Sequence, residues 1–320
     1  MNPSAFKAAA MQFSLTHQTF TRMKRLLRTA FMGFAYLTCS MPVVAQMASE
    51  GIPKPQSTDI ATQKSCRLTV SAVGRCAVTD QHVTLFRRRD AVVALGVVAV
   101  ATSLVSVDAS IARGFQRSSV QTNRGLKGAS NVFNTLGFPG SVIVSATTYF
   151  VGLGEHSRPL ATFGMHSGEA IVLGGVLAEG LQMAIGRARP SHDISDPRNF
   201  RFGKGFTDDD YTSLPSAHVT VAFAAATAAT IETRRSWPGA TRYVIPIAYG
   251  AAALAGASRM YKNKHWASDV AAGAGLGVYS AVLFDRYNRG HPDNIFERVF
   301  LPKSVLPEHR GVALVWSTLR

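Results

Sequence analysis

The chain alternates between long apolar stretches, rich in alanine and glycine, and short polar segments. Apolar runs of this length, with no regular alternation of apolar and polar residues, predict helices rather than strands. Six stretches stand out: 91–111, 140–153, 161–185, 216–233, 242–257 and 265–287. Proline or glycine separates them, at Pro139, Pro159, Pro190, Pro215, Pro238 and Gly239. We therefore expect an all-α bundle of about six core helices.

The segments that flank this bundle have a different composition. Residues 1–45 have the pattern of an export signal, with basic residues before an apolar run and cleavage predicted after Ala45. Residues 46–82 are polar and read as a linker or flexible arm, and 83–289 form the helical domain. The tail, 290–320, is expected to be irregular, with one possible short strand at 312–316.

The chain has three cysteines, and Cys39 falls in the predicted signal. Cys66 and Cys76 remain in the exported chain, where an oxidising compartment would allow them to pair. Two free thiols fit the sequence nearly as well.

Composition narrows the choice of partners. The net charge is +15, which suits anionic partners such as phosphorylated compounds or anionic lipid. No compact Lys/Arg tract or nucleic-acid motif is present, so nucleic acid is not expected. The mean hydropathy is +0.09, and His166, Glu169 and Glu179 interrupt the third apolar stretch. These features favour an exported domain that is soluble or peripheral to the membrane, with an integral six-helix protein as the alternative.

Chemistry-bearing residues cluster at the ends of three predicted helices. Arg187 and Arg189 close the third helix, where they could cradle an anion or simply face the negative end of the helix dipole. Ser216, Ala217 and His218 open the fourth helix, and free N–H groups at such a start bind phosphate readily. The alternative is an ordinary capped helix with an incidental histidine.

The third cluster lies in 258–269, between the last two helices. His265 and Asp269 are four residues apart, a spacing that puts both on one face of a helix. A carboxylate behind an imidazole fixes its tautomer. Arg259 adds a planar guanidinium suited to phosphate. Alone, the segment is equally compatible with a basic loop before an amphipathic helix.

Together, the motifs Arg187-Ala188-Arg189-Pro190, Pro215-Ser216-Ala217-His218 and Ser258-Arg259-x5-His265-x3-Asp269 resemble those of the type 2 phosphatidic acid phosphatase and vanadium haloperoxidase superfamily. The family pattern is Lys-x6-Arg-Pro, Pro-Ser-Gly-His and Ser-Arg-x5-His-x3-Asp. The resemblance implies that His265 attacks phosphorus, that Asp269 orients it, and that His218 protonates the leaving group. It further implies that Arg189, Arg259 and Ser216 hold phosphoryl oxygens.

Two positions depart from the family pattern. Gln182 stands where the family has lysine, so it keeps N–H donors but loses the charge. Arg187 or Lys204 could supply the positive charge that is missing at Gln182. Both Arg187 and Gln182 are predicted to contact phosphate. Ala217 replaces the family glycine, which is harmless if its backbone N–H serves in a first helical turn and strained if the position needs positive φ.

The resemblance implies a metal-independent phosphatase acting on a phosphomonoester or a lipid (pyro)phosphate through a phosphohistidine. The expected location is the periplasm or the cell membrane, with the site on the periplasmic side and no cofactor. One alternative is a haloperoxidase that holds vanadate in the same pocket. Another is an envelope protein that binds phosphate or lipid without turnover, which the loss of the lysine at Gln182 motivates.

Other residues carry weaker signals. The three consecutive aspartates at 208–210 could bind a metal, but a solvated loop is the simpler interpretation. No metal site is predicted. The histidines His156, His166 and His192 read as structural or surface residues. Aromatic residues in the loop before the fourth helix could contact a lipid tail or merely pack: Phe200, Phe202, Phe206 and Tyr211.

Overall fold

A computed structural model describes residues 84–291, 294, 304–308 and 311–315. Its main body is helical, which confirms the predicted all-α class. Five of the six predicted stretches each form one long helix. They are α7 (Ser141–Gly154), α8 (Arg158–Ile185), α9 (Ala217–Ser236), α10 (Thr241–Tyr261) and α11 (Ala267–Gly290).

The first predicted stretch is not one helix, and this corrects the sequence-based expectation. It divides into α3 (Arg88–Val105) and α4 (Asp108–Phe115), which meet at an angle of 64°. Two further helices, α5 (Ser118–Gln121) and α6 (Arg124–Thr135), were not predicted. Their sequences are largely polar, so they lack the continuous apolar signal by which the other helices were recognised. A break at Phe138, where the backbone is extended, separates α6 from α7.

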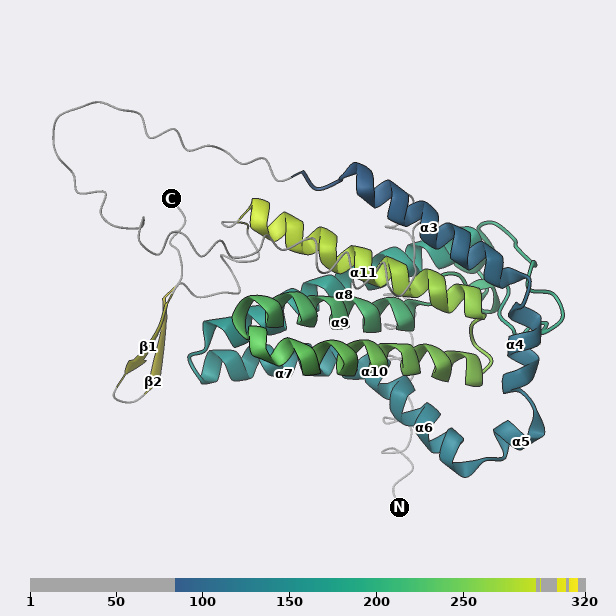
Figure 1. Ribbon diagram of the computed structural model, residues 1–320, viewed down its shortest axis with the longest axis horizontal. Coiled ribbons are helices and arrows are strands. Elements are labelled where there is room, and N and C mark those ends of the chain that lie inside the picture. The colour runs from purple at the N-terminus through teal and green to yellow at the C-terminus, as the bar shows by residue number, and fades with distance from the viewer. Residues whose placement is uncertain (1–83, 292–293, 295–303, 309–310, 316–320) are drawn as a thin grey trace, which may run out of the picture.

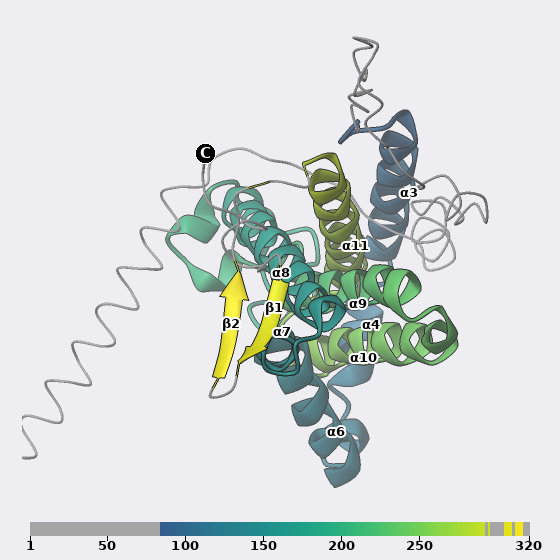
Figure 2. The same cartoon turned by 90° about the vertical axis from the view of Figure 1, so that its left-hand side faces the viewer.

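Helix α9 lies in the middle of the bundle and packs against α8, α10 and α11 (Figure 1). Outside this group, α7 packs on α8, α3 on α11, and α6 on α10 (Figure 2). The N-terminus of α9, the N-terminus of α11 and the C-terminus of α8 lie at one end of the bundle. This is the right-hand end in Figure 1, beside α4.

Small residues allow α9 and α11 to approach closely. A Cβ at Gly277 of α11 would overlap the backbone carbonyl of Thr220 and lie 2.9 Å from the backbone nitrogen of Ala224. One turn earlier, a Cβ at Gly273 would lie 2.6 Å from the carbonyl oxygen of Ser216. Helix pairs that pack on glycine or alanine bring their backbones closer than larger side chains allow. This contact holds the first turn of α9 against the first turn of α11.

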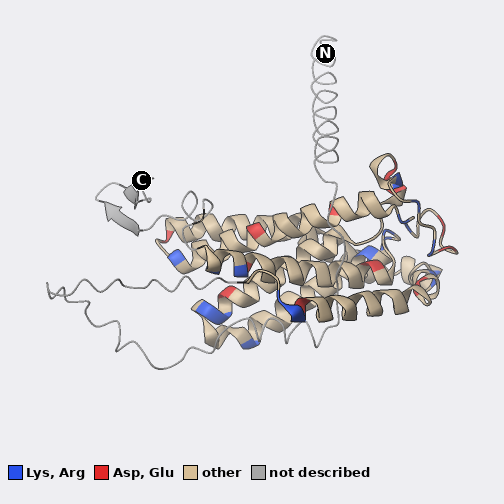
Figure 3. Ribbon diagram, turned by 90° about the horizontal axis from the view of Figure 1, so that it is seen from above, with Lys and Arg blue, Asp and Glu red and all other residues tan. Residues whose placement is uncertain are grey.

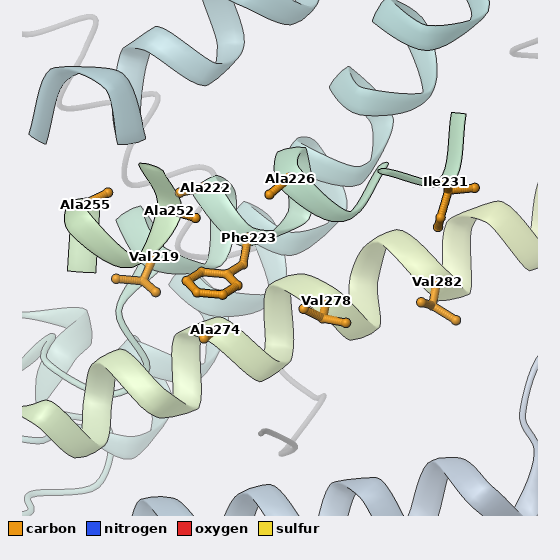
Figure 4. Close-up of a cluster of buried hydrophobic side chains, with 10 residues drawn as sticks. All are labelled: Val219, Ala222, Phe223, Ala226, Ile231, Ala252, Ala255, Ala274, Val278 and Val282. Atoms are coloured by element: carbon orange, nitrogen blue, oxygen red, sulfur yellow. The ribbon is translucent and has the colours of Figure 1, made fainter. Parts of the chain in front are cut away.

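The largest apolar cluster fills the space between α9, α10 and α11 (Figure 4). Phe223 occupies its centre, and alanine or valine side chains supply most of the rest. The buried members are Val219, Ala222, Phe223, Ala226, Ile231, Ala252, Ala255, Ala274, Val278 and Val282. Burying these side chains stabilises the arrangement by about 25 cal/mol for each Å² of apolar surface removed from solvent.

Within the part of the chain that the structure describes, three helical segments are long and apolar enough to cross a membrane: Arg124–Gly154, Arg158–Ile185 and Ala267–Gly290. The bent pair α3 and α4 adds a fourth if it counts as one span. Figure 3 shows few charged residues along much of these helices and a concentration of them in the loops at the α4 end. These helices support membrane association. By length and composition, they fit an integral membrane protein better than the soluble domain that the polar interruptions favoured.

The predicted C-terminal strand is confirmed in outline. Strand β2 (Gly311–Val315) pairs antiparallel with β1 (Ser304–Glu308), so this part of the tail is a hairpin rather than irregular chain. The predicted signal, the linker and all three cysteines lie outside the described residues.

We expect Gly277→Ala to lower the unfolding temperature, because the added methyl must push α9 away from α11, at a cost of about 1–3 kcal/mol. Gly250→Ala in α10 is the matched control, since nothing lies within 4 Å of the site of its Cβ. That change should leave the free energy of unfolding unchanged or raise it by up to about 1 kcal/mol. Thermal unfolding of the two purified variants checks this, and equal unfolding temperatures would contradict the close packing.

Candidate active site

Two loops at the α4 end of the bundle bring the three sequence motifs together. The first loop, 187–216, leaves α8 at Gly186, whose φ of 62° closes the helix in the left-handed conformation. The second, 262–266, joins α10 to α11 and turns at Asn263 with φ of 57°. The indole of Trp266 donates to the Ala188 carbonyl across 2.9 Å and ties the loops to each other.

His265 is buried, and its Nδ1 lies 2.7 Å from the backbone carbonyl oxygen of Ser213. A carbonyl only accepts hydrogen bonds, so Nδ1 carries the proton. Burial lowers the pKa of His265 well below its usual value, and the nearby charges of Arg259 and Arg189 lower it further. The ring is therefore neutral near neutral pH, which leaves the lone pair on Nε2.

Asp269 does not contact the His265 ring in the manner that the resemblance implies. Its Oδ2 accepts hydrogen bonds from the Ser213 hydroxyl, at 2.5 Å, and from the backbone N–H of Trp266, at 2.8 Å. The predicted orienting role therefore becomes indirect. Asp269 fixes Ser213, and the Ser213 carbonyl fixes the tautomer of His265.

Arg187 was predicted to bind phosphate, and its contacts contradict that prediction. The side chain is 1% exposed, and all five of its N–H donors have partners within the protein. Its guanidinium forms ion pairs with two carboxylates, Asp269 at 2.5 Å and Asp108 at 2.8 Å. The remaining acceptors are the Ser268 hydroxyl and the Pro197 carbonyl. No donor is left for a substrate, so Arg187 holds the site together rather than binding its ligand.

Asp108, at the start of α4, completes this buried cluster. It is fully buried and accepts from Arg187, from the Ser268 hydroxyl and from the Ser268 backbone N–H, the last at 2.9 Å. The bend between α3 and α4 brings this carboxylate to the N-terminus of α11, where an anion also interacts favourably with the helix dipole.

Three other motif residues carry buried donor atoms without a partner among the described residues. They are Nε of Arg189, Nε of Arg259 and the hydroxyl of Ser216. The Nη2 of Arg189 donates to Thr212, and the Nη1 of Arg259 donates to Asn134 of α6, so the two guanidinium groups are held in place from the side. Arg189 and Arg259 are close enough that each favours deprotonation of His265, and burial with Arg189 lowers the pKa of Arg259 to about 10.

His218 lies in the first turn of α9, and the ring of Phe138 packs edge-on against it with 5.6 Å between centroids. Burial lowers the pKa of His218 to about 3, and the charges of Arg259, Arg189 and Lys262 contribute to the shift. An anion placed among these cations would reverse their contribution, so the protonation of His218 depends on what the site holds.

The structure explains how the two departures from the family pattern, Gln182 and Ala217, are accommodated. Gln182 is buried in α8, and its Nε2 donates to the Pro215 carbonyl across 2.5 Å. It supports the loop that carries Ser216, a role different from the predicted phosphate contact. Ala217 begins α9 and lies outside the positive-φ residues of the described chain, so its Cβ causes no backbone strain.

The weaker candidates have ordinary explanations. His166 forms an ion pair with Glu232 at 2.8 Å, and the exposed His192 lies 3.8 Å from Asp210. His156 lies in the exposed turn after α7. The side chain of Asp208 accepts from the Asp210 backbone, as expected of a loop. Tyr211 packs with Arg201, whereas Phe202 is 82% exposed.

Sequence reasoning missed four residues that shape the site: Asp108, Asn134, Thr212 and Ser213. Asp108 had a usable signal, because a carboxylate inside a long apolar stretch must find a partner. Ser213 and Thr212 lie just before a recognised motif. Asn134 gave no signal, since it belongs to a polar helix far away in sequence.

One known protein family matches the part of the chain that carries the three motifs. The sequence model of the PAP2 superfamily matches residues 163–291. The chain is 40% identical over 68 residues to a lipid A 1-phosphatase from Porphyromonas gingivalis, a match that covers 21% of this chain and only 14% of that protein.

Among solved structures, the chain resembles a transmembrane PAP2 type phosphatidylglycerolphosphate phosphatase from Bacillus subtilis. The TM-score is 0.43 and the sequence identity 17%, over 63% of this chain and 98% of the other. All three motifs lie within residues 163–291, the segment that matches the PAP2 superfamily.

Proposed function

We propose that the protein is a phosphatase that hydrolyses a phosphate ester or diphosphate of a lipid through a phosphohistidine intermediate. One observation carries this proposal: the buried donors of Arg189, Arg259 and Ser216 have no partner in the part of the protein that the structure describes, and both arginines lie close enough to His265 to lower its pKa. Buried donors without partners are costly, and they are expected where a ligand supplies the acceptor.

The first step uses the lone pair on Nε2 of His265. This atom attacks phosphorus, the bond from phosphorus to the leaving oxygen breaks, and His218 supplies the proton that this oxygen needs. Arg189, Arg259 and Ser216 stabilise the charge on the three equatorial oxygens, which is the main demand of phosphoryl transfer. The proton stays on Nδ1 and remains hydrogen-bonded to the Ser213 carbonyl, so the imidazole can carry positive charge without moving.

The second step reverses these roles. His218, now neutral, takes a proton from water as the water oxygen attacks phosphorus. The bond between phosphorus and Nε2 breaks, which restores His265 and releases phosphate. The protein, the substrate and one water molecule supply every group in this cycle, so we propose that the reaction needs no metal.

A lipid substrate is supported by two observations. Three helical segments are long and apolar enough to span a membrane, so the site lies at the end of a membrane-associated bundle. The similar protein from Porphyromonas gingivalis is a lipid A 1-phosphatase, which acts on a lipid phosphate. The export-signal pattern in 1–45 leads us to place the site on the outer side of the membrane.

The donor set would accept vanadate as well as phosphate, because both are tetrahedral oxyanions. The haloperoxidase alternative is therefore tested directly, by halide oxidation in purified protein supplied with vanadate. Hydrolysis of a lipid phosphate in the absence of vanadate would favour the phosphatase.

The nucleophile is tested with a ³²P-labelled aryl phosphate in the presence of a metal chelator. We expect His265→Ala to lower hydrolysis by about a thousandfold or more and to abolish the base-stable, acid-labile label on the protein. His218→Ala should instead accumulate label, because an aryl oxide leaves without help while the attack by water still needs a base. Undiminished labelling of the His265 variant would refute the assignment, and loss of wild-type activity with chelator would refute metal independence.

Proton uptake tests the role of His218. The free protein holds this ring neutral near neutral pH, because its pKa is about 3. Burial is the largest cause of this low pKa, and the charges of Arg259 and Arg189 lower it further. A bound oxyanion offsets the charges, which raises the pKa and favours the protonated ring. Titration of the protein with vanadate in buffers of different ionisation enthalpy should therefore reveal net proton uptake, and His218→Gln should reduce it. Equal uptake by both proteins would assign the proton to the ligand.

Replacing each of the two arginines of the first motif should affect stability and catalysis differently. Arg187→Met leaves Asp108 and Asp269 buried without their cation and should lower the free energy of unfolding by about 3–5 kcal/mol. Arg189→Met removes one of several crowded cations, so it should keep or raise stability while sharply raising KM. Unfolding temperatures and steady-state kinetics measured on both variants check this contrast. Equal destabilisation would contradict the separate roles.

A further inference from the structure

A cavity of about 560 Å³ lies between α3, α8 and α11, beside the catalytic loops. Its size is that of a ligand pocket. Side chains from α3, α8 and α11 make most of its wall, and nearly all of them are apolar. They are Val98, Ala101, Thr102, Val105, Leu181, Ile185, Ala272 and Leu276.

The cavity is separate from the proposed phosphoryl site. Its inner wall consists of Leu214, Pro215, Arg187 and Ser268, whereas none of the histidines or unpaired donors of the site lines it. Arg187 cannot serve a ligand, because all its donors are occupied. Whatever fills the cavity therefore presses on the back of the loop that holds Ser213 and Ser216, not on the reacting atoms.

The mouth of the cavity has the composition of a membrane interface. Arg198 and Phe200 line it, and both are exposed. Phe202, two residues further along the same loop, is 82% exposed. Aromatic and basic side chains gather at the level of lipid headgroups. The apolar lining runs inward from this end along α8 and α11, two of the candidate spans.

The length of the apolar lining suits an extended chain. From Ser268 to Leu276 the cavity follows two turns of α11, which corresponds to roughly 12 Å along the helix axis. An apolar space with Arg198 at its rim matches an amphiphile that has an anionic head and a hydrocarbon tail.

We propose that this cavity binds one hydrocarbon chain of an anionic membrane lipid, distinct from the lipid that is hydrolysed, with its headgroup at Arg198. The chain packs against Leu214 and Pro215 and so supports the catalytic loop from behind. This proposal concerns binding and does not depend on the phosphatase activity.

The test uses the full chain in phosphatidylcholine vesicles with a long-chain fatty acid that carries a photoactivatable group near its tail. We expect the label to fall on residues 98–105 and 272–276, and an excess of the unlabelled fatty acid to remove it. Ala101→Trp should reduce labelling about tenfold, because the indole fills the cavity. Leu95→Trp, on an exposed position of the same helix, is the matched control and should label as the wild type does. Arg198→Gln should weaken labelling by the fatty acid but not by the corresponding alcohol.

Several results would overturn the proposal. Labelling that an excess of fatty acid does not remove, or that Ala101→Trp leaves unchanged, would mean ordinary contact with the bilayer. Displacement of the label by vanadate would mean that the cavity holds the tail of the substrate. Absence of label from the lining in wild-type protein would mean that another part of the chain or a second copy covers it. The competition experiment needs no variant, so a folding defect in Ala101→Trp cannot hide the outcome.

Discussion

The site depends on one buried guanidinium and the two carboxylates that it joins. Arg187 lies between Asp108 and Asp269, and none of the three side chains is more than 1% exposed. Removing ions from water costs several kcal/mol each, so such a cluster is stable only when every donor and acceptor is satisfied. The five hydrogen bonds of Arg187 meet this condition. They also fix three separate segments to one another: the end of α8, the start of α4 and the start of α11.

The effect of this cluster reaches His265 through a short chain of contacts. Arg187 holds Asp269, Asp269 holds the Ser213 hydroxyl, and the Ser213 carbonyl accepts from Nδ1 of His265. The backbone supports the same arrangement, because the Ser216 N–H donates to the Asp269 carbonyl where α9 and α11 meet on small residues. The tautomer of one ring thus depends on the close packing of two helices and on a carboxylate 157 positions earlier in the chain, Asp108.

The sequence was sufficient for the five long helices, because apolar stretches of helical length are a local pattern. The meeting of the three motifs was expected from the family resemblance, since the spacing of Arg259, His265 and Asp269 alone left a basic loop equally compatible. The sequence does not show which way the side chains of the two arginines in the first motif point. Arg187 and Arg189 are two residues apart and chemically identical, yet one faces two carboxylates and the other keeps a free donor. Only the path of loop 187–216 distinguishes them. Asn134 was missed for a related reason, since α6 has little apolar signal and reaches Arg259 only through the tertiary fold.

The proposed site holds two buried cations close together, and burial lowers the pKa of Arg189 even though four nearby carboxylates act to raise it. Arg189 and Arg259 lie close together, and their field acts with burial to keep His218 and His265 uncharged. A phosphoryl group that enters this field would supply the missing acceptors and offset the repulsion from the two arginines. Under the proposed mechanism, the anion thereby raises the pKa of His218, which burial and the cations lower in the free protein, and favours the proton that the first step needs. A neutral nucleophile and a protonated acid can then coexist within one small site, although the two histidines have the same intrinsic pKa. Their surroundings differ: the Ser213 carbonyl fixes the tautomer of His265, whereas in the proposed mechanism the charge of the substrate favours protonation of His218.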